Sequence, residues 1–171
     1  MIIASNFPFI QQEDIPNDFL TTFFRKNFET RQQAFLQDSS FKINERSDYF
    51  TYCIYNSFRF LKEGGILSAI TSNAWLGKEY GIQFKRFLID NFHIKYVFKS
   101  NAEHWFSDSK VSTIFSVFEK GHSSEETKFV TLNFKLEEKL NQESISEQLR
   151  QIENLYSEID NCSFERNTSW R

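Results

Sequence analysis

The stretch Met1-Ile2-Ile3-Ala4-Ser5-Asn6-Phe7-Pro8-Phe9 joins a short apolar run to an amide side chain, a turn-forming proline and an aromatic ring. Residues 2–5 predict the end of a buried strand, and the polar residues 11–16 predict the loop that leaves it. Asn6 to Phe9 would then lie at the carboxyl end of a strand, where an enzyme can hold a planar nitrogen base. We therefore expect the chain to start in the middle of a domain.

Downstream of this strand, the apolar residues change between helical and strand spacing. Gly64 and Gly65 follow one helical pattern and end it, because a left-handed residue after the last turn is most easily a glycine. The order strand, helix, strand, helix, strand predicts an α/β fold with a parallel sheet. We expect one helix that starts at residue 17, a second over 47–62 and a third over 75–92. The expected strands cover 2–5, 66–70 and 94–98. Residues 32–46 are too weakly patterned to assign.

The C-terminal part adds further strands and a helix. Residues 111–118 form a strand pattern with no helix before it, which predicts an antiparallel pair with 94–98 at a sheet edge. Residues 129–134 indicate one more strand. The charged helix expected over 135–160 would dock on the body or on a partner, so we divide the chain into residues 1–134 and a helical extension, 135–171.

Length and composition indicate one phenylalanine-rich domain with an appendage. The 171 residues suffice for one sizeable core, and 18% of them are aromatic, with Phe occurring 21 times. We expect most rings to pack and a few to stack on a ligand. A net charge of -3 argues against a free-standing nucleic-acid binder, because affinity for phosphates comes from clustered Lys and Arg. No secretory pattern and no apolar run of membrane-spanning length occurs, so we expect a soluble, cytoplasmic protein without membrane contact.

Other common kinds of site find little support. Cys53 and Cys162 lie far apart, so no disulfide framework is predicted, and Cys53 is expected to be a reduced, buried thiol. The three histidines have no metal-ligand spacing, and the five glycines cannot form a phosphate-binding loop after the first strand. His104, Ser107 and Asp108 are sequence neighbours, whereas a catalytic triad is assembled from separate elements, so nucleophilic catalysis is discounted.

Four segments, taken in order, carry a family resemblance. They are Asn6 to Phe9; Leu61-Lys62-Glu63-Gly64-Gly65; the strand 66–70 with Thr71-Ser72-Asn73-Ala74-Trp75-Leu76; and Trp105-Phe106-Ser107-Asp108-Ser109-Lys110-Val111-Ser112. From Ile2 to about Lys120 the chain resembles the adenine-specific (N6) DNA methyltransferases of restriction-modification systems. It resembles their TaqI-like branch, in which the cofactor motifs precede an Asn-Pro-Pro-Tyr/Phe motif. Phe7 stands where that motif has its first proline, so the turn is expected to be less rigid.

The resemblance implies a fold and a set of site residues. The fold would be the C-terminal half of a Rossmann-like methyltransferase sheet, with the strand at 111–118 inserted antiparallel between those at 66–70 and 94–98. The motif Asn6-Phe7-Pro8-Phe9 would be catalytic: the Asn6 side-chain oxygen and the Phe7 backbone carbonyl would accept hydrogen bonds from an adenine amino group. Phe9, Phe106 and Lys110 would contact the extruded base or its DNA. Without the resemblance, Phe106 would be interpreted as a core residue that anchors its loop, and no metal is implied.

The resemblance also implies what a complete enzyme adds to this chain. The glycine-rich loop and the acidic residue that hold S-adenosylmethionine would lie upstream of Met1, and a target-recognition domain would follow downstream. The chain alone is then expected to be inactive, to contact double-stranded DNA only within the full-length protein, and to self-associate through the exposed edge of its first strand. A noncatalytic α/β interaction module, or a degenerate methyltransferase remnant, is the chief alternative. A methyltransferase acting on RNA or protein amines is another.

Overall fold

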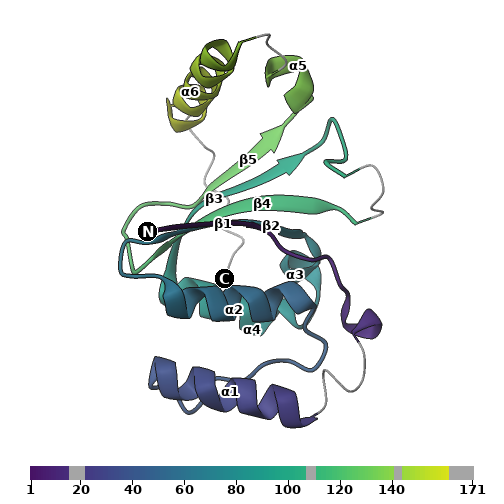
Figure 1. Ribbon diagram of the computed structural model, residues 1–171, viewed down its shortest axis with the longest axis vertical. Helices are drawn as coiled ribbons and strands as arrows, with labels where there is room; N and C mark the ends of the chain where they lie inside the picture. Colours follow the sequence, from purple (N-terminus) through teal and green to yellow (C-terminus); the bar gives the residue numbers. More distant parts are fainter. Residues whose placement is uncertain (16–21, 107–110, 141–143, 162–171) are drawn as a thin grey trace.

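The structure, a computed structural model, describes residues 1–15, 22–106, 111–140 and 144–161. In these residues a mixed sheet separates a thick layer of helices from a smaller helical pair (Figure 1). The strands are β1 (Ile2–Asn6), β2 (Ile66–Ser72), β3 (Phe92–Ser100), β4 (Thr113–Lys120) and β5 (Lys128–Leu132). The helices are α1 (Thr22–Leu36), α2 (Tyr49–Phe60), α3 (Ala74–Gly77), α4 (Gly81–Asn91), α5 (Leu136–Leu140) and α6 (Ile145–Asn161), with a short 3-10 turn, η1, at Gln12–Asp14.

The five-stranded sheet has the order β1-β2-β4-β3-β5. β1 pairs with β2 in parallel, with Asn6 opposite Ile70, and β3 pairs with β5 in parallel. β4 is antiparallel to both of its neighbours, β2 and β3. The prediction that the strand near residue 111 is inserted antiparallel between those near 66 and 94 is therefore confirmed, and so is the strand predicted near residue 129. The sheet-edge position predicted for this antiparallel pair is wrong, because β4 is the central strand and the edges are β1 and β5.

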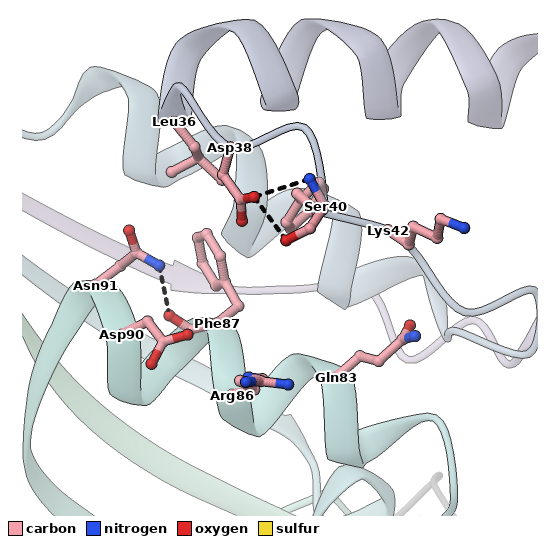
Figure 2. Close-up of a pocket in the computed structure, with 10 residues that line it drawn as sticks. Leu36, Asp38, Ser40, Lys42, Gln83, Arg86, Phe87, Asp90 and Asn91 are labelled. Carbon is pink, nitrogen blue, oxygen red and sulfur yellow. Dashed lines mark hydrogen bonds between the residues drawn. The ribbon is translucent and has the colours of Figure 1, made fainter.

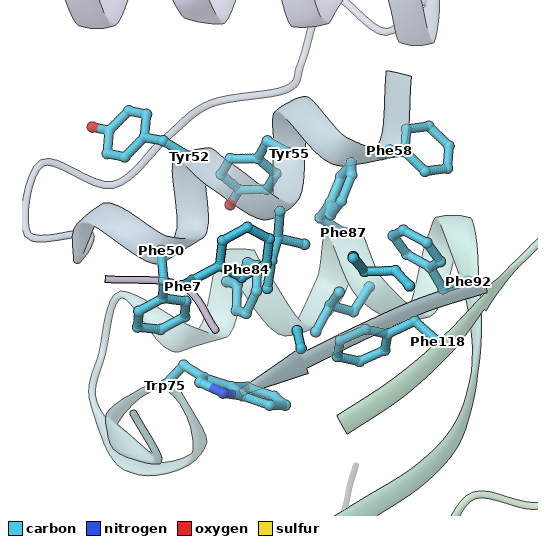
Figure 3. Close-up of a cluster of buried hydrophobic side chains, with 14 of the residues drawn as sticks. Phe7, Phe50, Tyr52, Tyr55, Phe58, Trp75, Phe84, Phe87, Phe92 and Phe118 are labelled. Carbon is cyan, nitrogen blue, oxygen red and sulfur yellow. The ribbon is translucent and has the colours of Figure 1, made fainter. Parts of the chain in front are cut away.

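Phenylalanine fills the main core, as the composition predicts. α2 and α4 pack against one face of the sheet, and α1 lies outside α2 as a further layer (Figure 1). Rings from α2 and α4 meet edge to face, for example Tyr55 with Phe84 at a centroid distance of 5.7 Å and Phe58 with Phe87 at 5.5 Å. α1 is fastened by Gln32, whose Nε2 donates to the Tyr55 carbonyl at 2.7 Å. Figure 3 shows this cluster, which extends from Phe7 and Trp75 to Phe92 and Phe118.

The other face of the sheet carries a smaller cluster, formed by Tyr96, Val130 and Leu132 with residues of α5 and α6 packed against it. A bulge in β3 directs neighbouring side chains into both clusters. Ile94 pairs with Phe118 whereas Tyr96 pairs with Val117, so one residue is inserted and the side-chain alternation shifts. Tyr96 consequently faces the small cluster, while Val97 joins Ile94 in the main core.

Two predicted helices are wrong in their continuity. The helix predicted over 75–92 is divided into α3 and α4, because the chain turns back at Lys78 to Tyr80 and brings Gly81 against the Trp75 carbonyl. The helix predicted over 135–160 is divided into α5 and α6. Ser144 starts α6 anew, since its backbone carbonyl and its Oγ both accept the Glu147 N–H, at 3.1 and 3.2 Å.

Smaller differences concern α1 and a thiol. α1 continues to Leu36, into the segment left unassigned, and residues 16–21 at its predicted start lie outside the described part. Cys53 is a free thiol as predicted, but it is half-buried, and this burial raises its pKa. Among the described residues, no helix is long and apolar enough to cross a membrane.

Candidate active site

The predicted site residues converge on one edge of the sheet. β1, β2 and β3 all run in the same direction, so Asn6, Ser72 and Ser100 end their strands at this edge, and β4 starts there at Thr113. In parallel α/β sheets, ligands bind outside the carboxyl ends of the strands. The topology therefore places the Asn6 to Phe9 motif, the turn after β2 and the loop that carries Phe106 in one region.

Asn6 is the last residue of β1 and its side chain is exposed. Its partner in the ladder is Ile70 of β2, which holds the backbone in register. Within the described residues no hydrogen bond engages its side-chain amide. The amide oxygen is thus available to accept a hydrogen bond from a ligand.

Phe7 has two anchors at the position of the expected proline. Its N–H donates to the Ile70 carbonyl at 3.3 Å, a bond that proline cannot make. Its ring is 8% exposed and lies in the main core near Phe50 and Trp75 (Figure 3). The hydrogen bond and the buried ring restrain the backbone at Phe7, as a proline ring would at this position.

Phe9 and Phe106 lie together although 97 positions separate them in the sequence. Their ring centroids are 5.3 Å apart with an interplanar angle of 63°, an edge-to-face contact. Both rings are half-buried, and Pro8 between Phe7 and Phe9 is exposed. In the described part of the chain, the core clusters include Trp105 but not Phe106, so the interpretation of Phe106 as a core residue is not supported. Lys110 lies outside the described residues.

The loop carrying Phe106 is fixed by polar contacts that the sequence did not reveal. Ser100 Oγ accepts the N–H groups of Ala102 and Glu103, at 3.2 and 3.1 Å. Asn101 N–H donates to the Leu132 carbonyl at 2.9 Å, and Glu103 Oε1 accepts the N–H at the start of α5, also at 2.9 Å. The Ser100 bonds are local, whereas the partners of Asn101 and Glu103 belong to β5 and α5, so no local pattern could have identified those two bonds.

The turn after β2 is likewise held by its own side chains. Ser72 Oγ accepts the N–H of Ala74 at 3.0 Å, and the indole Nε1–H of Trp75 donates to Thr71 Oγ1 at 3.3 Å. Asn73 N–H donates to the backbone carbonyl just before β4, at 2.9 Å. These bonds hold the Thr71-Ser72-Asn73 segment at the same edge of the sheet as Asn6, and Trp75 is a core residue.

Most of the glycines lie away from the Asn6 edge, and only Gly77, at the end of α3, follows β2 there. Gly64, Gly65 and Gly121 flank the other ends of β2 and β4, and the space beside Gly81 is filled by the Trp75 carbonyl. No group of three or more potential metal ligands is found among the described residues. The residues at this edge can position a base and its amino group.

A pocket of about 390 Å³ lies elsewhere, between the loop after α1 and one side of α4 (Figure 2). Asp38 Oδ1 in this pocket accepts the Ser40 hydroxyl at 2.6 Å and the Ser40 N–H at 2.8 Å, and these bonds lower the pKa of Asp38. Asp90 and Asn91 at the end of α4 line it too. Since α4 leads into the start of β3, the pocket is remote from the Asn6 edge.

Comparisons with known proteins identify a family. The family model of the Eco57I restriction-modification methylase matches residues 2–106. The Type II methyltransferase M.BstVI of Geobacillus stearothermophilus is 26% identical over 95 residues, which cover 56% of this chain. Those residues are 15% of the length of M.BstVI.

Two solved structures have a similar fold. A putative class I S-adenosylmethionine-dependent methyltransferase from Listeria monocytogenes has a TM-score of 0.57 at 18% identity, over 94% of this chain and 42% of its own. The type IIG restriction endonuclease BpuSI has a TM-score of 0.65 at 18% identity, over 96% of this chain and 17% of its own. The predicted α/β class, with its mixed sheet and C-terminal helix, is thereby confirmed.

Proposed function

Because this chain belongs to the Eco57I restriction-modification methylase family, we propose that it forms the target-base half of a DNA methyltransferase domain specific for the adenine amino group. The observation that carries the proposal is the contact between Phe9 and Phe106, 5.3 Å apart, beside the exposed Asn6 amide. A pair of half-buried rings next to a free acceptor matches the needs of a planar, amino-bearing base. Such a base must leave the duplex to reach the site.

The chemistry that we assign to this edge concerns the amino nitrogen. Its lone pair is delocalised into the adenine ring, which makes it a poor nucleophile. The Asn6 amide oxygen and the Phe7 carbonyl would accept hydrogen bonds from its two N–H groups and favour the pyramidal geometry that attack requires. S-adenosylmethionine would supply the electrophilic methyl group. Phe9 would stack on the base, and the anchored Phe7 backbone would keep both acceptors in place.

We assign the cofactor site to a segment that precedes these 171 residues, as the family resemblance implies. β1 supports this assignment: in the described part of the chain it pairs only with β2, and Ile2 is 73% exposed. In this proposal residues 135–171 lead toward a target-recognition domain. The exposed apolar row on α6, formed by Ile145, Leu149, Ile152 and Tyr156, is consistent with a partner surface there.

The open edge of β1 predicts self-association of the isolated chain. Phe7 N–H and the Met1 carbonyl both bond to β2. In a parallel ladder the N–H and C=O of one residue point to the same side, so the N–H and C=O of Ala4 point away from β2, toward the open edge. Light scattering should show a mass that rises with concentration. Ala4→Pro, which removes an outward donor, should lower that mass, whereas Ala4→Ser should not. A strictly monomeric wild type would contradict the prediction.

Methyl transfer tests the proposed function directly. The chain, alone and joined to its upstream coding segment, would be incubated with radiolabelled S-adenosylmethionine and long DNA that lacks adenine methylation. We expect label only with the joined protein, and N6-methyladenine after digestion to nucleosides. N4-methylcytosine would show that the target base is cytosine and not adenine. Label in RNA or protein instead would favour a methyltransferase that acts on RNA or protein amines. A joined, folded protein that binds S-adenosylmethionine without labelling any substrate would favour the interaction module.

Phe9 and Phe106 should matter through their rings. Each alanine substitution is expected to weaken capture of the extruded base by about 1–3 kcal/mol, the usual contribution of base-aromatic stacking. Phe9→Trp should be tolerated. Because the rings touch, the double variant should lose less than the sum of the single losses.

The measurement uses a fluorescent adenine analogue at the target position, once sequencing has identified the methylated site. Phe60→Ala is the matched control, because this ring at the end of α2 is 66% exposed and contacts neither site residue. Its flipping signal should equal that of the wild type. If Phe9→Ala flips the base as the wild type does, the aromatic part of the proposed site is wrong.

A further inference from the structure

Asp48 directly precedes α2, and the residue is 3% exposed. An aspartate at this position normally caps the helix by accepting a backbone N–H of the first turn. Here the side chain makes no such bond. The Thr51 N–H and hydroxyl bond instead to the Asp48 backbone carbonyl, at 3.1 and 2.7 Å. The buried carboxylate is therefore committed elsewhere.

The two carboxylate oxygens join two separate loops. Asp48 Oδ1 accepts the Gln12 N–H at 3.2 Å, and Asp48 Oδ2 accepts the Tyr80 hydroxyl at 2.5 Å. Gln12 belongs to the loop that follows Phe9, and Tyr80 belongs to the link between α3 and α4. An amide in place of the carboxylate could not accept both bonds in this geometry, because it has one acceptor oxygen.

These bonds fasten the far end of the motif. Next to Asp48, the Tyr49 N–H donates to the Ile10 carbonyl at 3.1 Å. The near end is held by the Phe7 N–H on the Ile70 carbonyl. Pro8 and Phe9 thus form an arch between two anchored ends, and the ring of Phe9 reaches Phe106 from that arch.

The surroundings of the carboxylate leave it dependent on these donors. In the described residues no salt bridge engages Asp48. The adjoining pocket of about 280 Å³ is lined by both signs of charge, Arg46 and Lys78 with Glu13 and Glu79. Burial, and then the bond to Asp48, raises the pKa of Tyr80, so its hydroxyl stays a donor. A buried carboxylate is costly unless it is hydrogen-bonded, so losing either donor should loosen the loops.

We propose that Asp48 is a positioning residue for methyl transfer, which holds the Pro8–Phe9 arch through Gln12 and ties it to the link between α3 and α4 through Tyr80. In this proposal Asp48 acts through Gln12 and Tyr80 and not by contact with the base or the cofactor. The inference rests on the proposed function for its catalytic consequence, whereas the clamp itself can be tested on the chain alone.

Hydrogen exchange by mass spectrometry tests the clamp. In Asp48→Asn the peptide that contains Gln12 should exchange about tenfold faster, the factor expected for losing one hydrogen bond to a charged group. Peptides within α4 and β3 should keep their wild-type rates. Tyr80→Phe should raise the exchange rate of the Gln12 peptide by a smaller factor. Asp90→Asn makes the same change at an exposed carboxylate on α4 and should leave that rate unchanged. If Asp48→Asn does not fold, the exchange rate of the Gln12 peptide in Tyr80→Phe decides whether the clamp exists. A Gln12 peptide that exchanges at the wild-type rate overturns the clamp.

Steady-state methylation by the joined protein tests the consequence. Asp48→Asn should lower kcat about tenfold while the KM for S-adenosylmethionine stays within twofold, because the arch and not the cofactor site is loosened. If the wild type methylates DNA and Asp48→Asn has the same kcat, the positioning role is overturned and the proposed function stands. If the wild type methylates nothing, the proposed function fails, and the exchange experiment still decides whether the clamp exists.

Discussion

Replacing Asn6 with alanine is expected to lower the kcat of methyl transfer by about 10²–10³-fold, the usual effect of removing one preorganised hydrogen-bonding group from an active site. The Asn6 amide ends β1 at the carboxyl edge of the sheet, and its oxygen is the side-chain acceptor that we assign to the adenine amino group. That bond strengthens as the nitrogen becomes pyramidal. The loss should therefore appear in kcat more than in DNA affinity.

The experiment compares steady-state methylation by the joined protein with three Asn variants. Asn6→Asp keeps an acceptor oxygen at the same place and should retain more activity than Asn6→Ala. Asn56→Ala, which replaces an exposed amide on α2, should match the wild type. Since Asn6 is exposed, its alanine variant should melt like the wild type. An unchanged kcat in Asn6→Ala would remove the central residue from the proposed mechanism.

Gly81→Ala is expected to destabilise the fold by about 3 kcal/mol, at the upper end of the cost of overpacking a core. A Cβ built on Gly81 would lie 1.9 Å from the carbonyl oxygen of Trp75 and 2.7 Å from its carbonyl carbon. These are backbone atoms, so no rotamer change can relieve the clash. Trp75 is 1% exposed and lies deep in the core, so α3 cannot easily move away.

Thermal and urea unfolding measure this effect. For a domain of this size, that loss corresponds to a Tm lowered by ~6–12 °C. Gly77→Ala is the matched control. A Cβ at Gly77 would meet nothing within 4 Å, and its Tm should stay close to that of the wild type. Equal stability of Gly81→Ala and Gly77→Ala would show that the α3–α4 turn tolerates rearrangement.

The parts of the fold that were predicted correctly depend on local patterns. Strand segments such as residues 66–70 are visible in the sequence because burial imposes a spacing, and the turn at Gly64 is visible because a positive φ selects glycine. The predicted end of the helix is wrong: α2 stops at Phe60 and Leu61 is extended, so Gly64 belongs to the turn before β2. The order of the sheet came from the family resemblance, with β4 placed antiparallel between β2 and β3.

The errors arose where distant contacts override local spacing. The apolar spacing of residues 75–92 fits one helix, but the packing of Gly81 on Trp75 divides it. The bulge in β3 is also invisible in the sequence, because it depends on packing against two clusters on opposite faces of the sheet. In both cases the deciding partner lies in another element.

The candidate site shows the same division. By itself the sequence determined the motif Asn6-Phe7-Pro8-Phe9 at a strand end, the α/β class and the phenylalanine-rich core, since strand ends, turns and apolar spacing are local properties. Only the tertiary structure decided that Phe9 meets Phe106, that the Phe7 N–H bonds to Ile70, and that Asp48 holds two loops instead of capping α2. These contacts join residues far apart in the chain, and a hydrogen bond or a ring contact exists only once the fold has placed both partners within a few ångströms.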